Sequence, residues 1–290
     1  MSGIKVCAVI VTYRPDWVKV AALVRTITQD CADYIIIDNS DLAGPVPPSL
    51  NVIGLGANLG IARAQNVGIA HCLEQHYDVI VFFDQDSILP DFFLSKLVQP
   101  IIDGTSRITA PVFYDEAAKF DYSIIAITKW GFRKKLHTSG QGGALTTNVV
   151  ISSGSAVASE VFGLAGTMDE GLFIDFVDTE WCLRCWQKGL SVLIVPQVSM
   201  AHSIGSTTLN FGFFRVPVHT PQRRYYRIRN SLLLLRMGHV PKLMALREIA
   251  FSLVQQFIMI ALCKERVAYF HHLVLGLRDG LFNKRGKLDS

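Results

Sequence analysis

Two carboxylates separated by one residue follow a run of apolar residues in the first third of the chain. Residues 79–83 predict a strand buried on both faces, and Asp84-Gln85-Asp86 comes directly after it. Acidic side chains this close repel each other unless a cation neutralises them. At the carboxyl end of a parallel strand, Mg²⁺ or Mn²⁺ held together with diphosphate oxygens would supply that charge. A solvated turn is the alternative, and the motif alone leaves both open.

Polar clusters also follow three other predicted strands, at residues 6–11, 34–37 and 51–55. A helix predicted at 18–28 makes a parallel βαβ unit of the first two strands, so that their ends share one sheet edge. Four polar clusters at one edge indicate a site for a phosphorylated ligand. Neither a G-x-G-x-x-G fingerprint nor a P-loop is present. These three clusters contain Thr12, Tyr13, Arg14, Asp38, Asn58 and Arg63.

Three acids, Asp175, Asp178 and Glu180, surround the predicted start of an amphipathic helix in the second half of the chain. Acids at a helix N-terminus usually interact favourably with the helix dipole. A carboxylate buried beside Phe176 and Trp181 would instead have a raised pKa, which suits a general base. The residue types leave both interpretations open.

Other residues of the second half give weaker signals. Cys182 and Cys185 form a C-x-x-C, but no second pair completes a zinc site, so we expect both thiols to pack in the core. His202 follows a strand predicted at 191–196, and a lone histidine is more often structural than a ligand. Residues 133–143 predict a polar loop, and residues 159–162 a helix.

The length of 290 residues allows one large α/β domain with an appendage. Half of the residues are hydrophobic and 18% are charged, yet no uninterrupted apolar stretch reaches the ~18 residues that cross a bilayer. The first residues lack the basic and apolar regions of a secretory signal peptide. We therefore expect a cytosolic protein that contacts a membrane surface without spanning it. The sequence carries no signal for an oligomeric state.

The basic residues gather at the C-terminal end. Residues 1–214 contain 14 Lys and Arg against 20 Asp and Glu, a net charge of −6, whereas residues 215–290 contain 14 against 4, a net charge of +10. Apolar segments at 243–246, 249–263 and 267–277 predict basic amphipathic helices. Such helices suit an anionic membrane surface or a cap on the catalytic domain. No recognition motif favours nucleic acid.

Taken together, these motifs resemble the inverting glycosyltransferases of family two, and most closely their bacterial rhamnosyltransferase branch. The resemblance runs from about residue 6 to about residue 230. It implies an α/β nucleotide-diphospho-sugar transferase fold of the GT-A type, a Rossmann-like mixed sheet with a C-terminal helical appendage. The implied domains are a catalytic domain at 1–214, with a donor half to about 105 and an acceptor half after it, and a helical region at 215–290.

The resemblance also implies a role for each motif. Asp178 corresponds to the catalytic base, although Val177 replaces an acid of the family's usual Glu-Asp pair, and Asp175 and Glu180 are the neighbouring acids. The implied metal ligands are Asp86 and His202, with Asp84 beside the ribose or on a metal-bound water. The implied donor residues are Thr12, Tyr13, Arg14, Asp38, Asn58, Gly60, Arg63, Asn66, Asp84 and Gln85. The implied contacts to acceptor or diphosphate are Trp181, Arg224, Tyr226 and Arg229.

The implied activity is metal-dependent transfer of a sugar, most often L-rhamnose from dTDP-L-rhamnose, with Mg²⁺ or Mn²⁺ as cofactor. The acceptor would be a saccharide hydroxyl, carried on a lipid during assembly of O-antigen or another cell-surface polysaccharide at the inner face of the plasma membrane. Three alternatives are another UDP, dTDP or GDP sugar, a haloacid dehalogenase-like phosphatase, and a non-catalytic sugar-nucleotide-binding protein.

Overall fold

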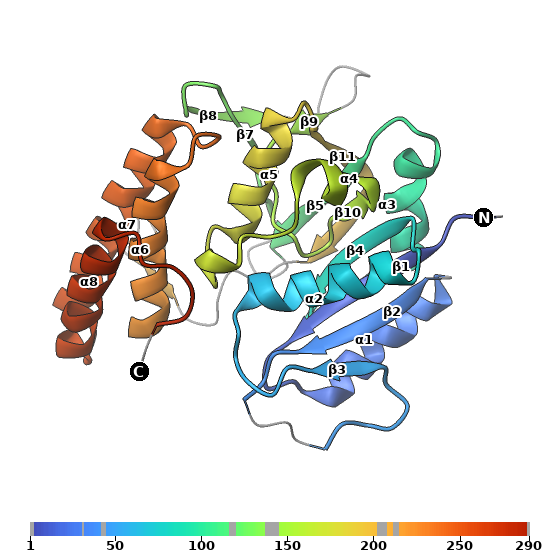
Figure 1. Cartoon of the computed structure of the whole chain (residues 1–290), viewed down its shortest axis with the longest axis horizontal. Helices are drawn as coiled ribbons and strands as arrows, with labels where there is room; N and C mark the ends of the chain where they lie inside the picture. The colour runs from blue at the N-terminus through green and yellow to red at the C-terminus, as the bar shows by residue number, and fades with distance from the viewer. Residues whose placement is uncertain are drawn as a thin grey trace.

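The computed structural model describes residues 3–30, 32–41, 45–115, 120–136, 145–201, 208–210 and 215–288. Within these residues, the centre is a mixed nine-stranded sheet with helices on both faces (Figure 1). Eight strands cross the sheet in the order β3 (Val52–Gly54), β2 (Asp33–Asp38), β1 (Val6–Thr12), β4 (Val79–Asp84), β10 (Ala156–Ala158), β5 (Ile108–Asp115), β11 (Val192–Ala201) and β9 (Thr146–Thr147). The ninth strand, β6 (Phe120–Asp121), pairs with β5.

The first four strands of the chain are parallel neighbours in the sheet. Their register pairs Val11 with Asp84, Thr12 with Asp38, and Asp38 with Gly54. The polar residues that follow these strands therefore lie at one edge of the sheet, as the sequence predicts. β10 runs antiparallel between β4 and β5, and β11 runs parallel to β5.

Two apolar layers cover the sheet, because its central strands are buried on both faces. Gly68 confirms that small residues bring a helix close to the sheet, since a Cβ atom there would lie 2.3 Å from Cγ1 of Val9. One face is covered by α1 (Trp17–Gln29) and α3 (Phe93–Ile102), and the other by α2 (Ile61–Glu74), α4 (Glu160–Ala165) and α5 (Val177–Gln187).

Two predicted boundaries are wrong. Residues 133–136 are not a loop but a strand, β8 (Arg133–Leu136), which pairs with β7 (Ile124–Ile127); the polar side chains face away from a core, so no apolar pattern marked the strand. β11 continues past Pro196, because a register shift between Val195 and Ser199 accommodates the proline. A second small pair joins β12 (Thr208–Asn210) to β13 (Arg215–Pro217).

Three helices, α6 (Pro221–Arg236), α7 (Lys242–Leu262) and α8 (Arg266–Leu281), pack together beside the sheet (Figure 1). The predicted domain boundary at 214 lies outside the described residues. The apolar segments predicted at 243–246 and 249–263 belong to one helix, since Arg247 and Glu248 interrupt the apolar run without interrupting α7. Among the described residues, α7 is the one helix long and apolar enough to cross a membrane by length and composition, with 39% of its most apolar window buried.

Two neighbouring side chains of α6 hold backbone oxygens of the segment that precedes α5, which includes a short 3₁₀ helix, η1 (Glu170–Leu172). Arg229 is fully buried and donates to the carbonyl oxygens of Gly171, at 3.1 Å, and Leu172, at 3.0 Å. Asn230 donates through Nδ2 to three carbonyl oxygens. We call Arg229 and Asn230 the carbonyl clamp. The oxygens that Asn230 binds belong to Leu172, Ile174 and Asp175, at 2.8, 2.7 and 3.1 Å.

Replacing the clamp guanidinium with an apolar side chain should destabilise the protein strongly. We expect Arg229→Met to lower the free energy of unfolding by about 3 kcal/mol or more, because the change leaves several buried carbonyl oxygens without donors. Urea denaturation followed by circular dichroism measures this. Arg236→Met is the matched control, since Arg236 is exposed and donates only at the surface, to Leu281 O. An equal loss of unfolding free energy in Arg229→Met and Arg236→Met would contradict the role of the clamp.

Candidate functional site

The acidic turn after β4 is fixed by hydrogen bonds on both sides. The backbone N–H of Asp84 donates to Oγ of Ser153 (3.1 Å), and the backbone N–H of Tyr13 donates to Oε1 of Gln85 (2.8 Å). Burial, and next the repulsion from Asp86, raise the pKa of Asp84 to about 6. The charge of Arg223 acts in the opposite direction but does not offset burial and the repulsion from Asp86, and a divalent cation would neutralise the remaining negative charge.

The ends of β1 and β2 form a second polar cluster around Asp38. The buried carboxylate of Asp38 accepts hydrogen bonds at Oδ1 from Oγ1 of Thr12 (2.9 Å) and from Oγ of Ser40 (2.7 Å). Oγ of Ser40 accepts in turn from the backbone N–H of Arg14 (2.7 Å), while the guanidinium of Arg14 pairs with exposed Asp41 (3.1 Å). These bonds fix the orientation of Asp38 before any ligand arrives.

The turn before α2 is attached to the same edge through Asn39. Its amide donates to Oδ1 of Asn58 (3.1 Å) and its Oδ1 accepts from the backbone N–H of Leu59 (2.8 Å). Sequence reasoning did not select Asn39, although its position inside the strand-end cluster was a signal. Gly60 has φ 89°, and a Cβ atom there would lie 2.6 Å from the carbonyl oxygen of Phe173, so only glycine fits.

The segment before α5 has an unusual backbone. Phe173, Asp175 and Phe176 all have positive φ, at 65°, 62° and 66°. The N–H of Ile174 donates to the carbonyl oxygen of Leu172 (2.7 Å), which makes Phe173 the centre of a γ-turn. Each such residue costs about 1–3 kcal/mol, and the carbonyl clamp holds this segment in place. Strained backbone of this kind is concentrated at functional sites.

Asp178 lies in the first turn of α5, immediately after the strained segment. Its Oδ1 accepts from the backbone N–H of Thr179 (2.8 Å). Burial is the largest influence on this carboxyl and raises its pKa to about 6, with further increases from the charges of Asp84 and Asp175. A carboxylate with this pKa accepts a proton efficiently near neutral pH.

A cavity of about 610 Å³ joins Asp84 and Asp178. Its walls include both carboxylates, Ser152 and Ser153 from the sheet side, and apolar residues of β7. Four arginines from β8, α6 and α7 line the same cavity: Arg133, Arg223, Arg227 and Arg247. The cavity is lined both by acids with raised pKa values and by arginines. Such a cavity suits a ligand that carries both hydroxyl and anionic groups.

Comparison with known proteins agrees with this geometry. A family model described as Glycosyl transferase family 2 matches residues 20–158. Over 280 residues the chain is 40% identical to the dTDP-rhamnosyl transferase RfbF of Shigella flexneri, and the match covers 94% of each chain. The chain belongs to glycosyl transferase family 2. Membership makes it a glycosyltransferase rather than a phosphatase or a non-catalytic binding protein, two alternatives that the sequence left open.

Solved structures share the fold of this family 2 glycosyltransferase. Crystalline GalNAc-T7 with UDP, GalNAc and Mn²⁺ has a TM-score of 0.56 at 15% identity, over 91% of this chain and 58% of that chain. TarS 1–349 of S. aureus in complex with UDP-GlcNAc has a TM-score of 0.55 at 11% identity, over 97% of this chain and 82% of that chain. These neighbours confirm the predicted GT-A type α/β fold with C-terminal helices.

Arg63 and Asn66 of the glycosyltransferase face the segment around η1. Arg63 pairs with Glu170 (3.0 Å), and Asn66 donates through Nδ2 to Glu170 (2.8 Å) and to the carbonyl oxygen of Met168 (3.0 Å). Oδ1 of Asn66 also accepts from the N–H of Met168 (2.8 Å). The geometry therefore gives both side chains a structural role between α2 and η1, and their contact with the donor stays a prediction.

Glu180 and Trp181 also have structural partners. Burial raises the pKa of Glu180, but hydrogen bonds from His239 and Arg184 outweigh burial and lower the pKa below its ordinary value. His239 and Arg184 each lie 2.8 Å from that carboxylate. Nε1 of Trp181 donates to the carbonyl oxygen of Gly166 (2.8 Å). Neither side chain lines the cavity, so the geometry does not support their predicted roles.

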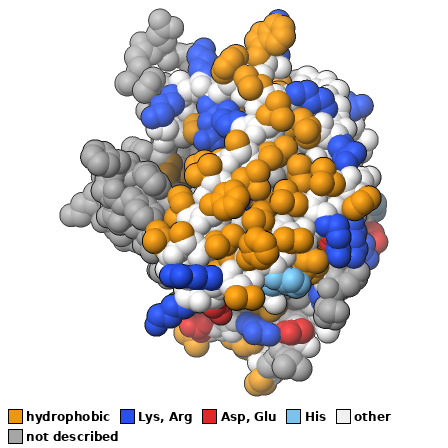
Figure 2. Space-filling model, turned by 90° about the vertical axis from the view of Figure 1, so that its left-hand side faces the viewer, with side chains coloured by type: hydrophobic (Ala, Val, Ile, Leu, Met, Phe, Trp, Pro, Cys, Tyr) orange, Lys and Arg blue, Asp and Glu red, His pale blue; other side chains and the backbone are white. Residues whose placement is uncertain are grey.

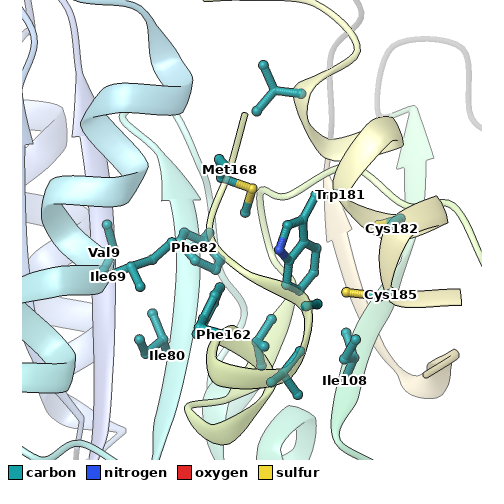
Figure 3. Packing of buried hydrophobic residues seen from close by; sticks show 14 of the residues in the cluster. Val9, Ile69, Ile80, Phe82, Ile108, Phe162, Met168, Trp181, Cys182 and Cys185 are labelled. Carbon is teal, nitrogen blue, oxygen red and sulfur yellow. The ribbon is translucent and has the colours of Figure 1, made fainter. Parts of the chain in front are cut away.

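The core that receives Trp181 also holds the C-x-x-C pair (Figure 3). The indole stacks on Phe162, with the ring centroids 5.5 Å apart. Cys182 and Cys185 are buried free thiols in the same cluster, and burial raises the pKa of Cys185 to about 12. The packing predicted for these cysteines is what the structure shows.

Three predicted ligand contacts lie within the helical interface. Arg224 is fully buried and bonded to Gln255 and Gln256 of α7 (2.9 Å each), and Arg229 belongs to the carbonyl clamp. Tyr226 stacks on Phe173 at 4.6 Å between centroids. The geometry gives all three a structural role, because the helices of this region can pack only if such polar groups find partners.

His202, one of the predicted metal ligands, lies outside the described residues. Within the described part of the chain, no group of three or more His, Cys, Asp or Glu side chains is arranged to hold a metal ion. Asp84 and Asp86 still suit Mg²⁺ or Mn²⁺, because such ions often bind one or two carboxylates and complete their shell with substrate phosphates and water.

The buried charge of Asp178 should reduce stability above its pKa. Since the pKa is about 6 in the folded protein and about 3.9 in an unfolded chain, the ionised form is disfavoured by folding, and stability rises as the pH falls through 6. We expect Asp178→Asn to raise the free energy of unfolding at pH 7.5 by up to about 3 kcal/mol, and the difference to vanish below about pH 4. Urea denaturation across this pH range measures it, with exposed Asp91→Asn as control. If the difference in unfolding free energy between Asp178→Asn and the wild type did not change with pH, the raised pKa of Asp178 would be contradicted.

Proposed function

We propose that this family 2 glycosyltransferase moves L-rhamnose from dTDP-L-rhamnose to a saccharide hydroxyl, with inversion at the anomeric carbon. The observation that carries this proposal is the cavity that Asp84, at the acidic turn after β4, shares with Asp178. The 40% identity to the dTDP-rhamnosyl transferase RfbF of Shigella flexneri supports the choice of donor.

The donor nucleotide binds at the edge formed by β1, β2 and the turn before α2. The hydrogen bonds around Asp38 and Asn39 support this assignment, because a preorganised polar edge recognises the base and ribose without rearrangement. The residues assigned to the donor are Thr12, Tyr13, Arg14, Asp38, Asn58, Gly60, Asp84 and Gln85.

Asp178 is the general base. Its carboxylate accepts the proton of the acceptor hydroxyl while that oxygen bonds to the anomeric carbon and the bond from this carbon to the dTDP oxygen breaks. A single displacement from the opposite face inverts the anomer and requires no nucleophile from the protein. The other candidate, Asp175, pairs with Arg223 (3.3 Å) and Arg227 (3.7 Å), which favours Asp178 as the base.

The acidic turn would hold a divalent cation, Mg²⁺ or Mn²⁺, together with the donor diphosphate. Asp86 would be a ligand of the ion, Asp84 would face the ribose or a water on the ion, and His202 would be a further ligand. A bridge between Ile88 and Ala201 joins the end of β11 to the segment after the acidic turn. When bound, the ion offsets the negative charge that develops on departing dTDP. The Mn²⁺ in crystalline GalNAc-T7 agrees with this choice of cofactor.

The acceptor is a lipid-linked saccharide, and the protein meets an anionic membrane through α7 and α8 at the cytoplasmic face. Figure 2 shows a broad apolar surface over these helices, with Lys and Arg around it. Exposed basic residues at the helix ends include Lys242, Lys264 and Arg266. The exposed apolar side chains include Leu246, Phe251, Val254, Phe257, Leu262, Val267, Phe270, Val274 and Leu281.

The inverted polarity of α7 supports this membrane contact. Its inward face buries Glu248, Ser252, Gln255 and Gln256, while its outward face is apolar. A helix in a water-soluble protein usually shows the reverse arrangement. Apolar surface surrounded by basic side chains is the composition that binds an anionic bilayer interface.

Two substitutions separate the base from the metal site. Asp178→Asn should lower kcat by about 10²–10⁴-fold and leave the KM for dTDP-L-rhamnose nearly unchanged, because only the proton acceptor is lost. Asp86→Ala should weaken Mg²⁺-dependent binding of dTDP without affecting metal-free binding. Steady-state kinetics and titration calorimetry measure these effects. Normal turnover by Asp178→Asn would rule out the base assignment, and exposed Asp91→Asn should behave as wild type.

Flotation with liposomes containing anionic lipid tests the membrane contact. The full chain should float with the vesicles, and a variant with four outward apolar side chains changed to serine should stay in the soluble fraction. A matched control changes two exposed apolar residues of the catalytic domain, Val18 and Leu164, to serine. Equal recovery of both variants with the vesicles would defeat the proposal. The four changes are Phe251→Ser, Val254→Ser, Phe257→Ser and Phe270→Ser.

A further inference from the structure

We propose that the arginines around Glu248 form a binding site for a phosphate group carried by the acceptor. This inference rests on the proposed function, because it takes the cavity that contains Asp178 as the acceptor site. It adds a class of acceptor: a saccharide with a phosphate or diphosphate next to the sugar that is modified.

Three guanidinium groups surround one carboxylate. Arg133 and Arg247 lie 3.0 and 3.2 Å from Oε1 of Glu248, and Arg227 lies 3.6 Å from Oε2. The carboxylate of Glu248 is only 4% exposed, whereas the arginines are 53%, 32% and 23% exposed. The guanidinium groups therefore keep accessible surface after binding Glu248.

The cluster has more positive than negative charge. Arg227 also lies near Asp175, and Arg223 pairs with the same carboxylate, so four arginines face two acids. The same positive field acts on a neighbouring histidine: burial, and next the charge of Arg223, lower the pKa of His219 to about 4. The cavity as a whole is lined by four arginines and by four acids, Asp84, Asp175, Asp178 and Glu248. The positive charge that favours an anionic ligand is therefore local to the arginines around Glu248.

One N–H group of Arg247 has no hydrogen-bond acceptor among the described residues. Within the described residues, Nε of Arg247 is buried and has no hydrogen-bond partner, although Nη1 of the same side chain donates to the carbonyl oxygen of Gly131 (3.1 Å). Unpaired buried donors are rare because each costs free energy. Guanidinium groups bind phosphate oxygens through two parallel hydrogen bonds, which would satisfy this donor.

The position of the arginines favours the acceptor over the donor. Of the residues assigned to the donor, the described lining of the cavity includes Asp84, but not Thr12, Asp38 or Asn58. The lining also includes Asp178, the proposed base, and apolar side chains of Ile125, Ile127, Val149 and Met244. A phosphate bound beside Glu248 would thus orient the acceptor so that its hydroxyl faces Asp178.

The phosphate could belong to a lipid or to a soluble saccharide phosphate. Arg247 lies on α7, the helix that carries much of the apolar surface of Figure 2. The two sources share the same phosphate chemistry, and probes with and without a lipid chain distinguish them.

Titration calorimetry with the full chain tests the site, with Mg²⁺ and saturating dTDP present to occupy the donor site. The probes are geranyl diphosphate and inorganic pyrophosphate. We expect geranyl diphosphate to bind in the presence of dTDP, and Arg133→Gln and Arg247→Gln each to weaken it at least tenfold. Arg107→Gln is the matched control, because Arg107 forms an exposed pair with Glu160 (2.8 Å) away from the cavity. Arg133→Gln on the β7–β8 hairpin keeps the test valid if the change in α7 impairs folding.

The outcomes separate the two proposals. Equal binding of both probes, with the same loss in the variants, supports the site and assigns it to a soluble phosphate. Displacement of geranyl diphosphate by dTDP, or unchanged binding in both variants, overturns the site. Binding of dTDP and hydrolysis of dTDP-L-rhamnose are measured on the same samples; their absence in the wild-type protein would contradict the proposed function while leaving phosphate binding to be judged by the variants.

Discussion

The carbonyl clamp is the contact on which the arrangement of the site depends. Arg229 and Asn230 donate to several backbone oxygens of one short segment, and that segment contains a γ-turn and further residues with positive φ. Strain of a few kcal/mol persists only where surrounding contacts outweigh it. Because the clamp is on α6, it also attaches the C-terminal helices to the sheet, so that β7, α5, α6 and α7 together enclose one cavity.

The carboxylates of the cavity lie in two different electrostatic environments. Asp84 and Asp178 have raised pKa values because they are buried and repel other acids, whereas Asp175 and Glu248, which line the same cavity, are paired with arginines. The first arrangement lowers stability in the absence of ligand and prepares one carboxylate for a cation and the other for a proton. The second is stable without ligand and retains positive charge for an anion.

The C-terminal helices have their polar groups inside and apolar groups outside. Arg224 is buried among the amide side chains of α7, so the helices associate through hydrogen bonds as well as through apolar contacts such as that between Met259 and Tyr269. Such an interface is directional, because each buried donor requires its acceptor. The apolar surface that faces outward is then available to contact a membrane. The cavity lies on the other side of the same helix.

The amino-acid sequence by itself determined the strands and the sheet edge, since apolar runs and the residues that end them act locally; Asp38 and Asp84 were found in this way. The tertiary structure decided which polar residues face the cavity. Trp181 and Arg224 have residue types suited to binding, but their partners come from distant segments that no local pattern reveals. The cluster around Glu248 is the converse case: its arginines come from β8, α6 and α7, and only packing brings them together.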